Sequence, residues 1–367
     1  MNIFEELDLQ RYINAQDTFT KYGASCMSQT SLRAMYEISR SWVDLDQVQC
    51  HAGDAIARMT RNEGAYLTNG AAGGLVICAA AALALDEESV YDALPDTGHR
   101  CEIIVQRAQH NSYDTSLRTA GAKLVWTGSE TMAPTEAEFE AAFNGRTAAV
   151  AYFIYHGREA SLPLETVIRI AHAKNVPVIV DAAAQNPPAE NLWKYTGMGA
   201  DMVVFSGGKT LCGPQDSGLI VGKELWVRRC RRWGPPRDGV CRCCKTSREA
   251  MVGLYTALRD YLAQDQEAAH ARQATLCALW EETAHRCGCT HVRRTEEGPV
   301  GQRLWRSFAT PACIDAAEAA RRMKENGIYI GVTDDGRELV FNPLLLNEEQ
   351  TLRVCEATRL ALEAKEN

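Results

Sequence analysis

The stretch that decides the fold is residues 201–218, DMVVFSGGKTLCGPQDSG. Its apolar, β-rich run at 202–205 is long enough for one buried strand. The run ends at Ser206-Gly207-Gly208, and Lys209 follows at once. A lysine at this position would lie at the edge of a sheet, where α/β proteins bind their ligands. A solvated lysine beside a hairpin turn explains the stretch equally well. The residues of the preceding strand distinguish between the two interpretations.

The preceding strand ends in a carboxylate. The apolar run PVIV at 177–180 is followed by Asp181, 28 residues before Lys209. Two successive strands would therefore bring an acid and an amine to the same edge of one sheet. Enzymes that use pyridoxal 5'-phosphate (PLP) need this pair, because a lysine forms the imine and an acid keeps the pyridine nitrogen protonated. The sequence predicts Lys209 as the covalent anchor and Asp181 as the partner of the ring nitrogen.

Composition restricts the class of protein. The 367 residues are 46% hydrophobic and 23% charged, which is typical of a soluble globular protein. A net charge of −8 argues against binding to nucleic acid that is mainly electrostatic. The acidic start MNIFEELDLQRY is no signal peptide, no apolar run has membrane-spanning length, and the 14 cysteines are scattered. We therefore expect a cytoplasmic protein with reduced thiols, no membrane association and a small-molecule substrate.

Strand and helix patterns alternate through most of the chain, which predicts an α/β fold with a mostly parallel sheet covered on both faces. We expect an N-terminal arm and helix at 1–45, and a large PLP-binding domain at 46–246. A connecting helix at 247–285 would lead to a small C-terminal α+β domain at 286–367. The strands of the large sheet are expected at 65–67, 102–105, 123–126, 148–154, 176–180, 202–205 and 218–221.

A phosphate-binding turn is predicted at Thr68-Asn69-Gly70-Ala71-Ala72. It opens the small-residue stretch 71–85, which has the composition of a buried helix. The first turn of a helix offers free N–H groups and the positive end of the helix dipole, which suit a phosphate. Close packing of a small-residue helix would explain the same composition without any ligand.

Two further residues complete the predicted cofactor site. His110 follows the strand at 102–105 and could stack on the pyridine ring, with Tyr113 as a weaker candidate. A lone histidine is just as often structural. Ser206 lies three residues before Lys209 and could donate to the phosphate. Once substrate has displaced Lys209 from the imine, the freed Lys209 amine could move the Cα proton of the substrate.

The stretch 226–244 is rich in arginine, cysteine and turn residues. One interpretation is a basic, mobile active-site loop. A metal site is the other, with Cys230, Cys241, Cys243 and Cys244 as ligands. Zinc sites usually use paired Cys-x-x-Cys spacing, which adjacent Cys243 and Cys244 do not provide. We therefore expect no metal.

Long segments resemble a known family. GAYLTNGAAGGL, QHNSYDTSLRTAGAKLV, VDAAAQNPPAENLWKYTGMGADMVVFSGGKTLCGPQDSGLIVG and RYINAQDTFT are similar to the selenocysteine synthase-like PLP enzymes. That superfamily includes L-seryl-tRNA(Sec) selenium transferase and D-glucosaminate-6-phosphate ammonia-lyase. The resemblance covers roughly 11–260 and, more loosely, the C-terminal domain.

The resemblance implies a PLP-dependent aminotransferase fold of type I, with Lys209 as the Schiff-base lysine and an active site at a homodimer interface. GVCRCCK matches the family's Gly-Arg-Pro-x-Lys stretch, so Arg242 and Lys245 are expected to contact an anion, with Gln185 as a further substrate contact. Here Cys243 replaces the family's proline. A family arginine after the last Asn/Asp-Pro is absent, because Asn342-Pro343 is followed by leucine.

Several reactions are open to such a site. We expect α,β-elimination from a small amino acid or amino sugar acid, of the ammonia-lyase type. Amino-acid racemisation, selenium transfer to seryl-tRNA and non-catalytic PLP binding are the alternatives. The acidic chain and the lack of an obvious RNA-binding domain before the large domain disfavour tRNA. The basic cluster at 228–237 suits a phosphorylated sugar acid, but a solvated surface or a subunit interface explains it as well.

Overall fold

The computed structural model describes residues 2–96, 98, 100–154 and 158–363. The chain divides into two compact units. The large unit is Ser25–Ala263, and the small unit combines Met1–Ala24 with Gln264–Asn367. The N-terminal residues thus belong with the C-terminal part of the chain, whereas the sequence placed them in a separate arm at 1–45.

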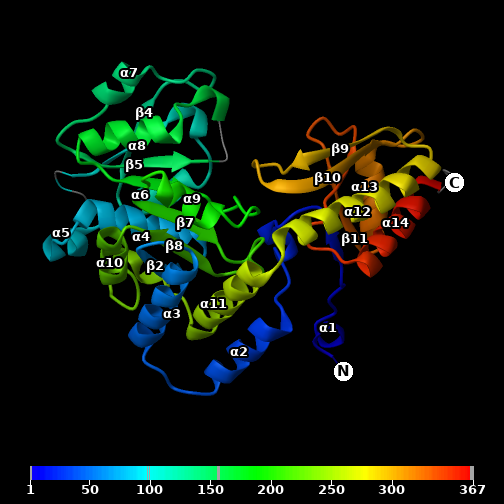
Figure 1. Ribbon diagram of the computed structural model, residues 1–367, viewed down its shortest axis with the longest axis horizontal. Coiled ribbons are helices and arrows are strands. Elements are labelled where there is room, and N and C mark those ends of the chain that lie inside the picture. The colour runs from blue at the N-terminus through cyan, green and yellow to red at the C-terminus, as the bar shows by residue number, and fades with distance from the viewer. Residues whose placement is uncertain (1, 97, 99, 155–157, 364–367) are drawn as a thin grey trace. The chain divides into compact units, whose positions relative to one another are not determined.

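The large unit is built on a seven-stranded sheet (Figure 1). Strand β8 runs antiparallel to its neighbours β2 and β7, and the other neighbouring strands are parallel. The predicted α/β fold with a mostly parallel sheet is confirmed. The strands, in spatial order, are β2 (Gly64–Thr68), β8 (Gly218–Gly222), β7 (Met202–Ser206), β6 (Val178–Asp181), β5 (Thr147–Phe153), β3 (Glu102–Gln106) and β4 (Lys123–Thr127).

Helices cover both faces of this sheet, and alternate residues of each strand point to opposite faces. Ile103 and Val105 pack in a core with helix α4 (Ala71–Ala84), while Ile104 packs in a second core with α8 (Leu164–Ala173). Helix α4 is buried throughout from Gly73 to Ala84, as its all-apolar composition predicts. The remaining helices of this unit are α2 (Gln29–Ser39), α3 (Leu45–Met59), α5 (Glu88–Ala93), α6 (Asp114–Thr119), α7 (Glu136–Ala141), α9 (Asn191–Gly197), α10 (Glu224–Trp233) and α11 (Arg248–Ala263).

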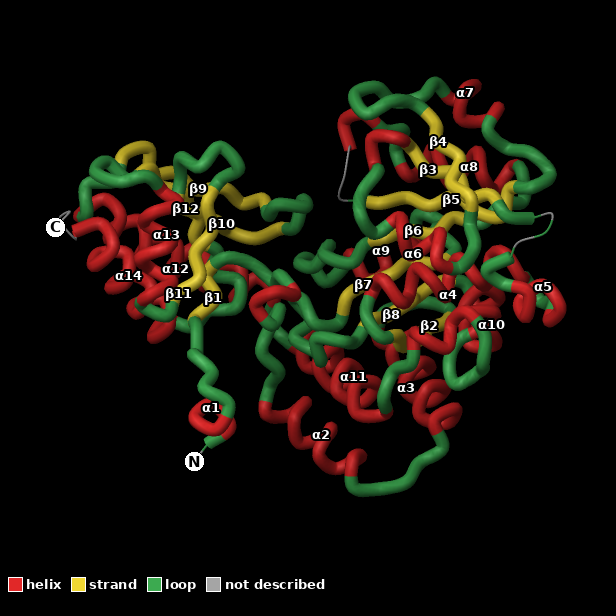
Figure 2. The backbone as a smooth tube through the Cα atoms, turned by 180° about the vertical axis from the view of Figure 1, so that it is seen from behind, coloured by secondary structure: helices red, strands yellow, loops and turns green. Residues whose placement is uncertain are grey.

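The small unit contains a five-stranded sheet and helices, seen from behind in Figure 2. Strand β1 pairs in parallel with β11, and the other pairs are antiparallel. The strands, in spatial order, are β1 (Ile13–Ala15), β11 (Ile328–Val332), β12 (Leu339–Phe341), β10 (Arg303–Thr310) and β9 (Thr290–Glu297). The helices are α1 (Ile3–Glu6), α12 (Gln266–Arg286), α13 (Ala316–Glu325) and α14 (Glu348–Glu363).

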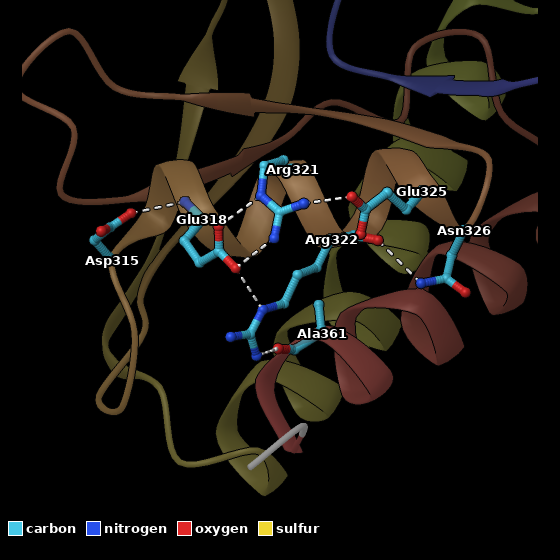
Figure 3. Close-up of polar contacts among 7 residues, drawn as sticks. All are labelled: Asp315, Glu318, Arg321, Arg322, Glu325, Asn326 and Ala361. Atoms are coloured by element: carbon cyan, nitrogen blue, oxygen red, sulfur yellow. Dashed lines mark hydrogen bonds and ion pairs between the residues drawn. The ribbon is translucent and has the colours of Figure 1, made fainter. Parts of the chain in front are cut away.

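Helix α13 carries a network of ion pairs around Glu318 (Figure 3). Arg321 and Arg322 each donate to the Glu318 carboxylate at 2.7 Å. These two guanidinium groups lower the pKa of Glu318 to about 2. Asp315 caps the helix by accepting from the Glu318 N–H at 2.7 Å. Arg322 also donates to the Ala361 carbonyl at 3.3 Å, so the network joins α13 to α14.

The stretch predicted as one connecting helix at 247–285 forms two helices in different units. Helix α11 ends at Ala263, and α12 begins at Gln266. The Asp265 side chain caps α12 by accepting from the Ala268 N–H at 2.9 Å. Because such a cap requires non-helical backbone at Asp265, the helix cannot run through this point. Over the residues described, no helix is long and apolar enough to cross a membrane.

Candidate active site

Three adjacent strands bring polar groups and a glycine to one edge of the large sheet. Thr68 at the end of β2 is paired with Gly218, the first residue of β8. Gly218 is paired in turn with Ser206, the last residue of β7. A Cβ atom at Gly218 would lie 2.4 Å from the carbonyl carbon of Gly70, so only glycine allows this close approach. Predicted phosphate contacts 138 residues apart in the chain, Thr68 and Ser206, are therefore separated by a single strand.

Strand β6 brings Asp181 to the same edge. Asp181 is in register with Val204 of β7, and the Ser206 N–H donates to the Ala183 carbonyl at 3.2 Å. The Asp181 carboxylate accepts from the Ala183 N–H at 3.0 Å. Burial raises the pKa of Asp181, while this hydrogen bond and the charge of Lys209 oppose the rise. The structure thus places the two principal predicted residues within electrostatic reach of each other.

The loop after β7 holds Lys209 in a tight turn. The Gly207 N–H donates to the Ser217 carbonyl at 2.8 Å, and the Cys212 N–H donates to the Lys209 carbonyl at 2.9 Å. A Cβ atom at Gly208 would lie 2.5 Å from the Cα atom of Gln215, so the residue before the lysine must be glycine. The Lys209 side chain remains partly exposed at the sheet edge.

The predicted phosphate turn forms the start of helix α4. Gly70 has a φ of 94°, in the region that favours glycine, and it precedes the first helical residue, Ala71. The Thr68 hydroxyl donates to the Gly70 carbonyl at 2.9 Å. Gly70 supplies no side-chain cap to helix α4. The N–H groups of the first turn, including those of Ala71 and Ala72, can therefore donate to a phosphate.

The amide of Asn69 is only half paired. Its Nδ2 donates to the Cys243 carbonyl at 3.4 Å, whereas its buried Oδ1 has no hydrogen-bond partner among the residues described. Buried polar atoms are usually paired, and an unpaired one at a binding site is a position for a ligand contact or an ordered water. Oδ1 can only accept, so a phosphate would have to pair with the Nδ2 or the main-chain N–H of Asn69.

His110 lies beyond the end of β3, and its contacts come from α6 and β4. Its Nδ1 is 2.5 Å from Oδ2 of the buried Asp114, which also pairs with Arg118. Its ring stands edge-on to Trp126, with 5.3 Å between ring centroids. Asp114 fixes the orientation of the imidazole, while 46% of the His110 side chain is exposed. Its predicted stacking role on a cofactor ring stays a prediction.

The predicted substrate contacts fall into two groups. Gln185 is buried, and its Oε1 accepts from the Tyr195 hydroxyl at 3.4 Å, so this amide also supports the loop after β6. Arg242 and Lys245 are exposed on and beside the 3-10 turn at Val240–Cys244. The bond from Asn69 to the Cys243 carbonyl links this turn to the phosphate turn. Two cations therefore lie on a segment that contacts the candidate site.

Six of the ten residues of the basic cluster at 228–237 belong to helix α10, and three of its arginines, Arg229, Arg231 and Arg237, are ion-paired. Arg229 contacts Asp86 at 2.7 Å, and Arg237, just beyond the helix, contacts Glu88 at 2.9 Å and Asp92 at 3.0 Å. These acids lie in and beside α5. The loop interpretation is wrong for residues 226–233, because the apolar positions of α10 recur on one helical face and pack in the core. It stays a prediction for the non-helical residues that follow and the 3-10 turn.

The cysteines of this stretch do not gather as metal ligands. Cys230, Cys241 and Cys244 are buried, and Cys243 is exposed. Throughout the described ranges, no three or more His, Cys, Asp or Glu side chains are grouped to hold a metal ion.

The sequence did not single out Ser25 or Gln109. The Ser25 hydroxyl donates to the Gly208 carbonyl at 2.6 Å, which braces the Lys209 loop from the segment before α2. Gln109 Oε1 accepts from the Phe153 N–H at 3.0 Å and so joins the ends of β3 and β5. Ser25 lies 183 residues from Gly208, and no local pattern marks such a contact.

Comparison with known proteins places this site in a family. Residues 56–236 match the family model "Aminotransferase class-V". D-glucosaminate-6-phosphate ammonia lyase of Salmonella typhimurium is 30% identical, covering 83% of this chain and 81% of the relative. 5'-C-glycyluridine monooxygenase-decarboxylase of a Streptomyces species is 31% identical, covering 87% and 79%. A solved structure of D-glucosaminate-6-phosphate ammonia-lyase superposes with a TM-score of 0.86 and 26% identity, over 99% of this chain and 98% of that one.

The mostly parallel sheet, the lysine after β7 and the acid at the end of β6 define a subunit of the fold type I class of PLP-dependent enzymes. Within that class, the chain belongs to the aminotransferase class-V family, in the group that includes D-glucosaminate-6-phosphate ammonia-lyase. The recognised resemblance is confirmed.

Proposed function

We propose that the protein is a PLP-dependent ammonia-lyase that eliminates water from a 2-amino-3-hydroxy acid. Water then hydrolyses the resulting imine, so that the net products are a 2-keto acid and ammonia. The observation that carries this proposal is the relation to D-glucosaminate-6-phosphate ammonia-lyase over nearly the whole chain. A phosphorylated amino sugar acid is therefore the substrate class. The exposed cations Arg242 and Lys245, on a segment bonded to the phosphate turn, suit its anionic end.

The donor set at the sheet edge fits PLP. Thr68, Asn69, Ser206 and the N–H groups at the start of α4 would hold the phosphate, and Lys209 would hold the cofactor covalently. When bound, PLP supplies an acceptor for the electron pair left at the substrate Cα. The close approach of Gly218 to Gly70 leaves no room for a side chain between the strands that carry these donors.

Two residues of the chain would handle protons. Asp181 would share a proton with the ring nitrogen, and its raised pKa matches it to that basic partner. The Lys209 amine would move the proton at the substrate Cα, because the tight loop keeps it at the sheet edge next to Asp181. His110, oriented by Asp114, would limit the tilt of the ring.

The test is to incubate the purified protein with PLP and D-glucosaminate 6-phosphate, and to measure ammonia and 2-keto acid. We expect equal amounts of both products. Lys209→Ala should lower the rate by about 10²- to 10⁴-fold. The wild type should show an absorbance band near the visible edge that borohydride removes, and Lys209→Ala should lack this band.

Other outcomes would assign another reaction. Inversion at Cα without ammonia would contradict the lyase and support a racemase. Oxygen uptake with release of carbon dioxide would support the second candidate, an oxidative decarboxylase, which the 31% identity to the Streptomyces relative favours. A tight, salt-sensitive complex with seryl-tRNA would support selenium transfer.

The proposal includes a cytoplasmic homodimer. The family resemblance supports the homodimer, and so do apolar side chains exposed on and beside α2, where Tyr36 is 62% and Trp42 is 98% exposed. Sedimentation velocity at micromolar concentration should give twice the 40.5 kDa mass of the chain. A monomer under these conditions would contradict this part.

A further inference from the structure

Two adjacent thiols lie where the 3-10 turn contacts the phosphate turn. Cys243 is exposed, Cys244 is buried, and their Sγ atoms are 3.9 Å apart. Arg242 precedes the pair and Lys245 follows it. The proposed elimination uses neither thiol.

The backbone of this pair is bonded to the candidate site. The Cys243 carbonyl accepts from the Asn69 Nδ2 at 3.4 Å. That carbonyl belongs to the peptide group that joins Cys243 to Cys244. A bond between the two sulfur atoms would close a ring that contains this same peptide group.

We propose that Cys243 and Cys244 are a peroxide-sensitive pair, and that a disulfide between them weakens phosphate binding at the turn formed by residues 68–72. The first part stands on the thiols alone, whereas the second rests on the proposed function.

The chemistry balances with a peroxide as the oxidant. The Cys243 thiol loses its proton and its sulfur attacks one peroxide oxygen, so that the O–O bond breaks and the sulfur becomes a sulfenic acid. The other oxygen takes up the thiol proton and leaves as an alcohol or water. The Cys244 thiol then attacks the Cys243 sulfur. The S–S bond forms, and the hydroxyl leaves with the thiol proton as water.

Ring closure would move the carbonyl that Asn69 contacts. The two sulfur atoms must approach from 3.9 Å to about 2.05 Å. Since only one peptide group separates the two Cα atoms, this approach has to rotate that group. The Cys243 carbonyl would then leave Asn69, whose side chain belongs to the phosphate turn.

The test treats the full-length protein with hydrogen peroxide and maps the product by mass spectrometry. We expect a loss of two hydrogens on the peptide that contains 243 and 244, reversed by dithiothreitol. PLP affinity, measured by equilibrium dialysis before and after oxidation, should fall about three- to tenfold, the loss expected when one ordinary hydrogen bond is disturbed. Reduced protein that binds no PLP would contradict the proposed function but leave the mass test intact.

Matched variants separate this pair from the other thiols. Cys243→Ser and Cys244→Ala should abolish both the mass change and the loss of affinity, whereas Cys313→Ser removes an exposed thiol of the small unit and should change neither. The proposal is overturned if Cys243 is oxidised only to sulfinic acid, or if the disulfide forms without a change in PLP affinity. Circular dichroism of each variant checks that the fold is retained.

Discussion

At the scale of single residues, Asp181 differs in two ways from a carboxylate exposed to solvent. It ends a buried strand, so its pKa is raised by burial, and it lies within reach of the Lys209 charge, which opposes that rise. Without a bound partner, ionised Asp181 is an unfavourable group. The same property makes it a suitable partner for a protonated ring nitrogen.

The charge on Asp181 should therefore lower the stability of the protein freed of cofactor. Between its unfolded pKa of 3.8 and its raised folded pKa, the native state binds more protons, so stability falls as pH rises through this window. The Asp181→Asn variant has no carboxyl group at this position, so its stability should not fall in this window for this reason. Urea denaturation of the cofactor-free proteins should show the variant gaining stability over the wild type as pH rises from about 4, with a plateau above the folded pKa.

The control for this pH dependence is Lys209→Ala. Removing the amine takes away a charge that lowers the pKa of Asp181, so the window should extend to higher pH. A stability difference between Asp181→Asn and wild type that does not change with pH would contradict the assignment.

At the scale of elements, the arginine-rich stretch shows how neighbours determine the use of a charge. Arg237 contacts Glu88 and Asp92 and lies over the rings of Tyr91 and Trp233. Arg242 has one long contact, 3.8 Å, with the exposed Asp238. The two arginines are five positions apart, yet the first holds elements together and the second is available to a ligand.

Alanine at these two positions should give opposite results. Arg237→Ala should lower the melting temperature with no change in KM, because it loses two ion pairs and two ring contacts. Arg242→Ala should raise KM for a phosphorylated substrate and leave the melting temperature unchanged. Thermal unfolding and steady-state kinetics on the same preparations measure both. The reverse pattern would place the substrate anion at Arg237.

At the scale of the whole molecule, the N-terminal segment completes a sheet made by the C-terminal part of the chain. Strand β1 pairs with β11, and the Asn342 N–H donates to the Ala15 carbonyl at 2.9 Å. Ile13 and Ala15 are buried in the core of the small unit. The small unit therefore depends on residues more than 300 positions apart.

Deleting residues 2–16 should destabilise the small unit alone. The deletion exposes the edge of β11 and opens the core around Ile13 and Ala15. Hydrogen exchange read by mass spectrometry should show faster exchange in β11, β12 and α14, with β5–β7 unchanged. Faster exchange across the large sheet as well would show that the two units unfold together. Ile13→Ala is a milder variant that should act in the same direction.

The sequence by itself determined the order of strands and helices in the large unit, because buried strands and amphipathic helices leave local periodic patterns. It also marked Lys209, Asp181 and Gly70, since residues that end a strand or open a helix are recognisable from their immediate neighbours. It erred at two places where a local signal was present: the capping Asp265 between α11 and α12, and the helical spacing of the apolar residues of α10.

Only the tertiary structure determined which of the predicted site residues lie close together. Strand β8, inserted between β2 and β7, brings Thr68 and Ser206 to one edge, and no local pattern contains that register. The roles of Arg237 and Arg242 were likewise decided by which acids lie nearby. Local propensity acts over a few residues, whereas strand pairing and ion pairing join segments whose separation along the chain carries no signal of their contact.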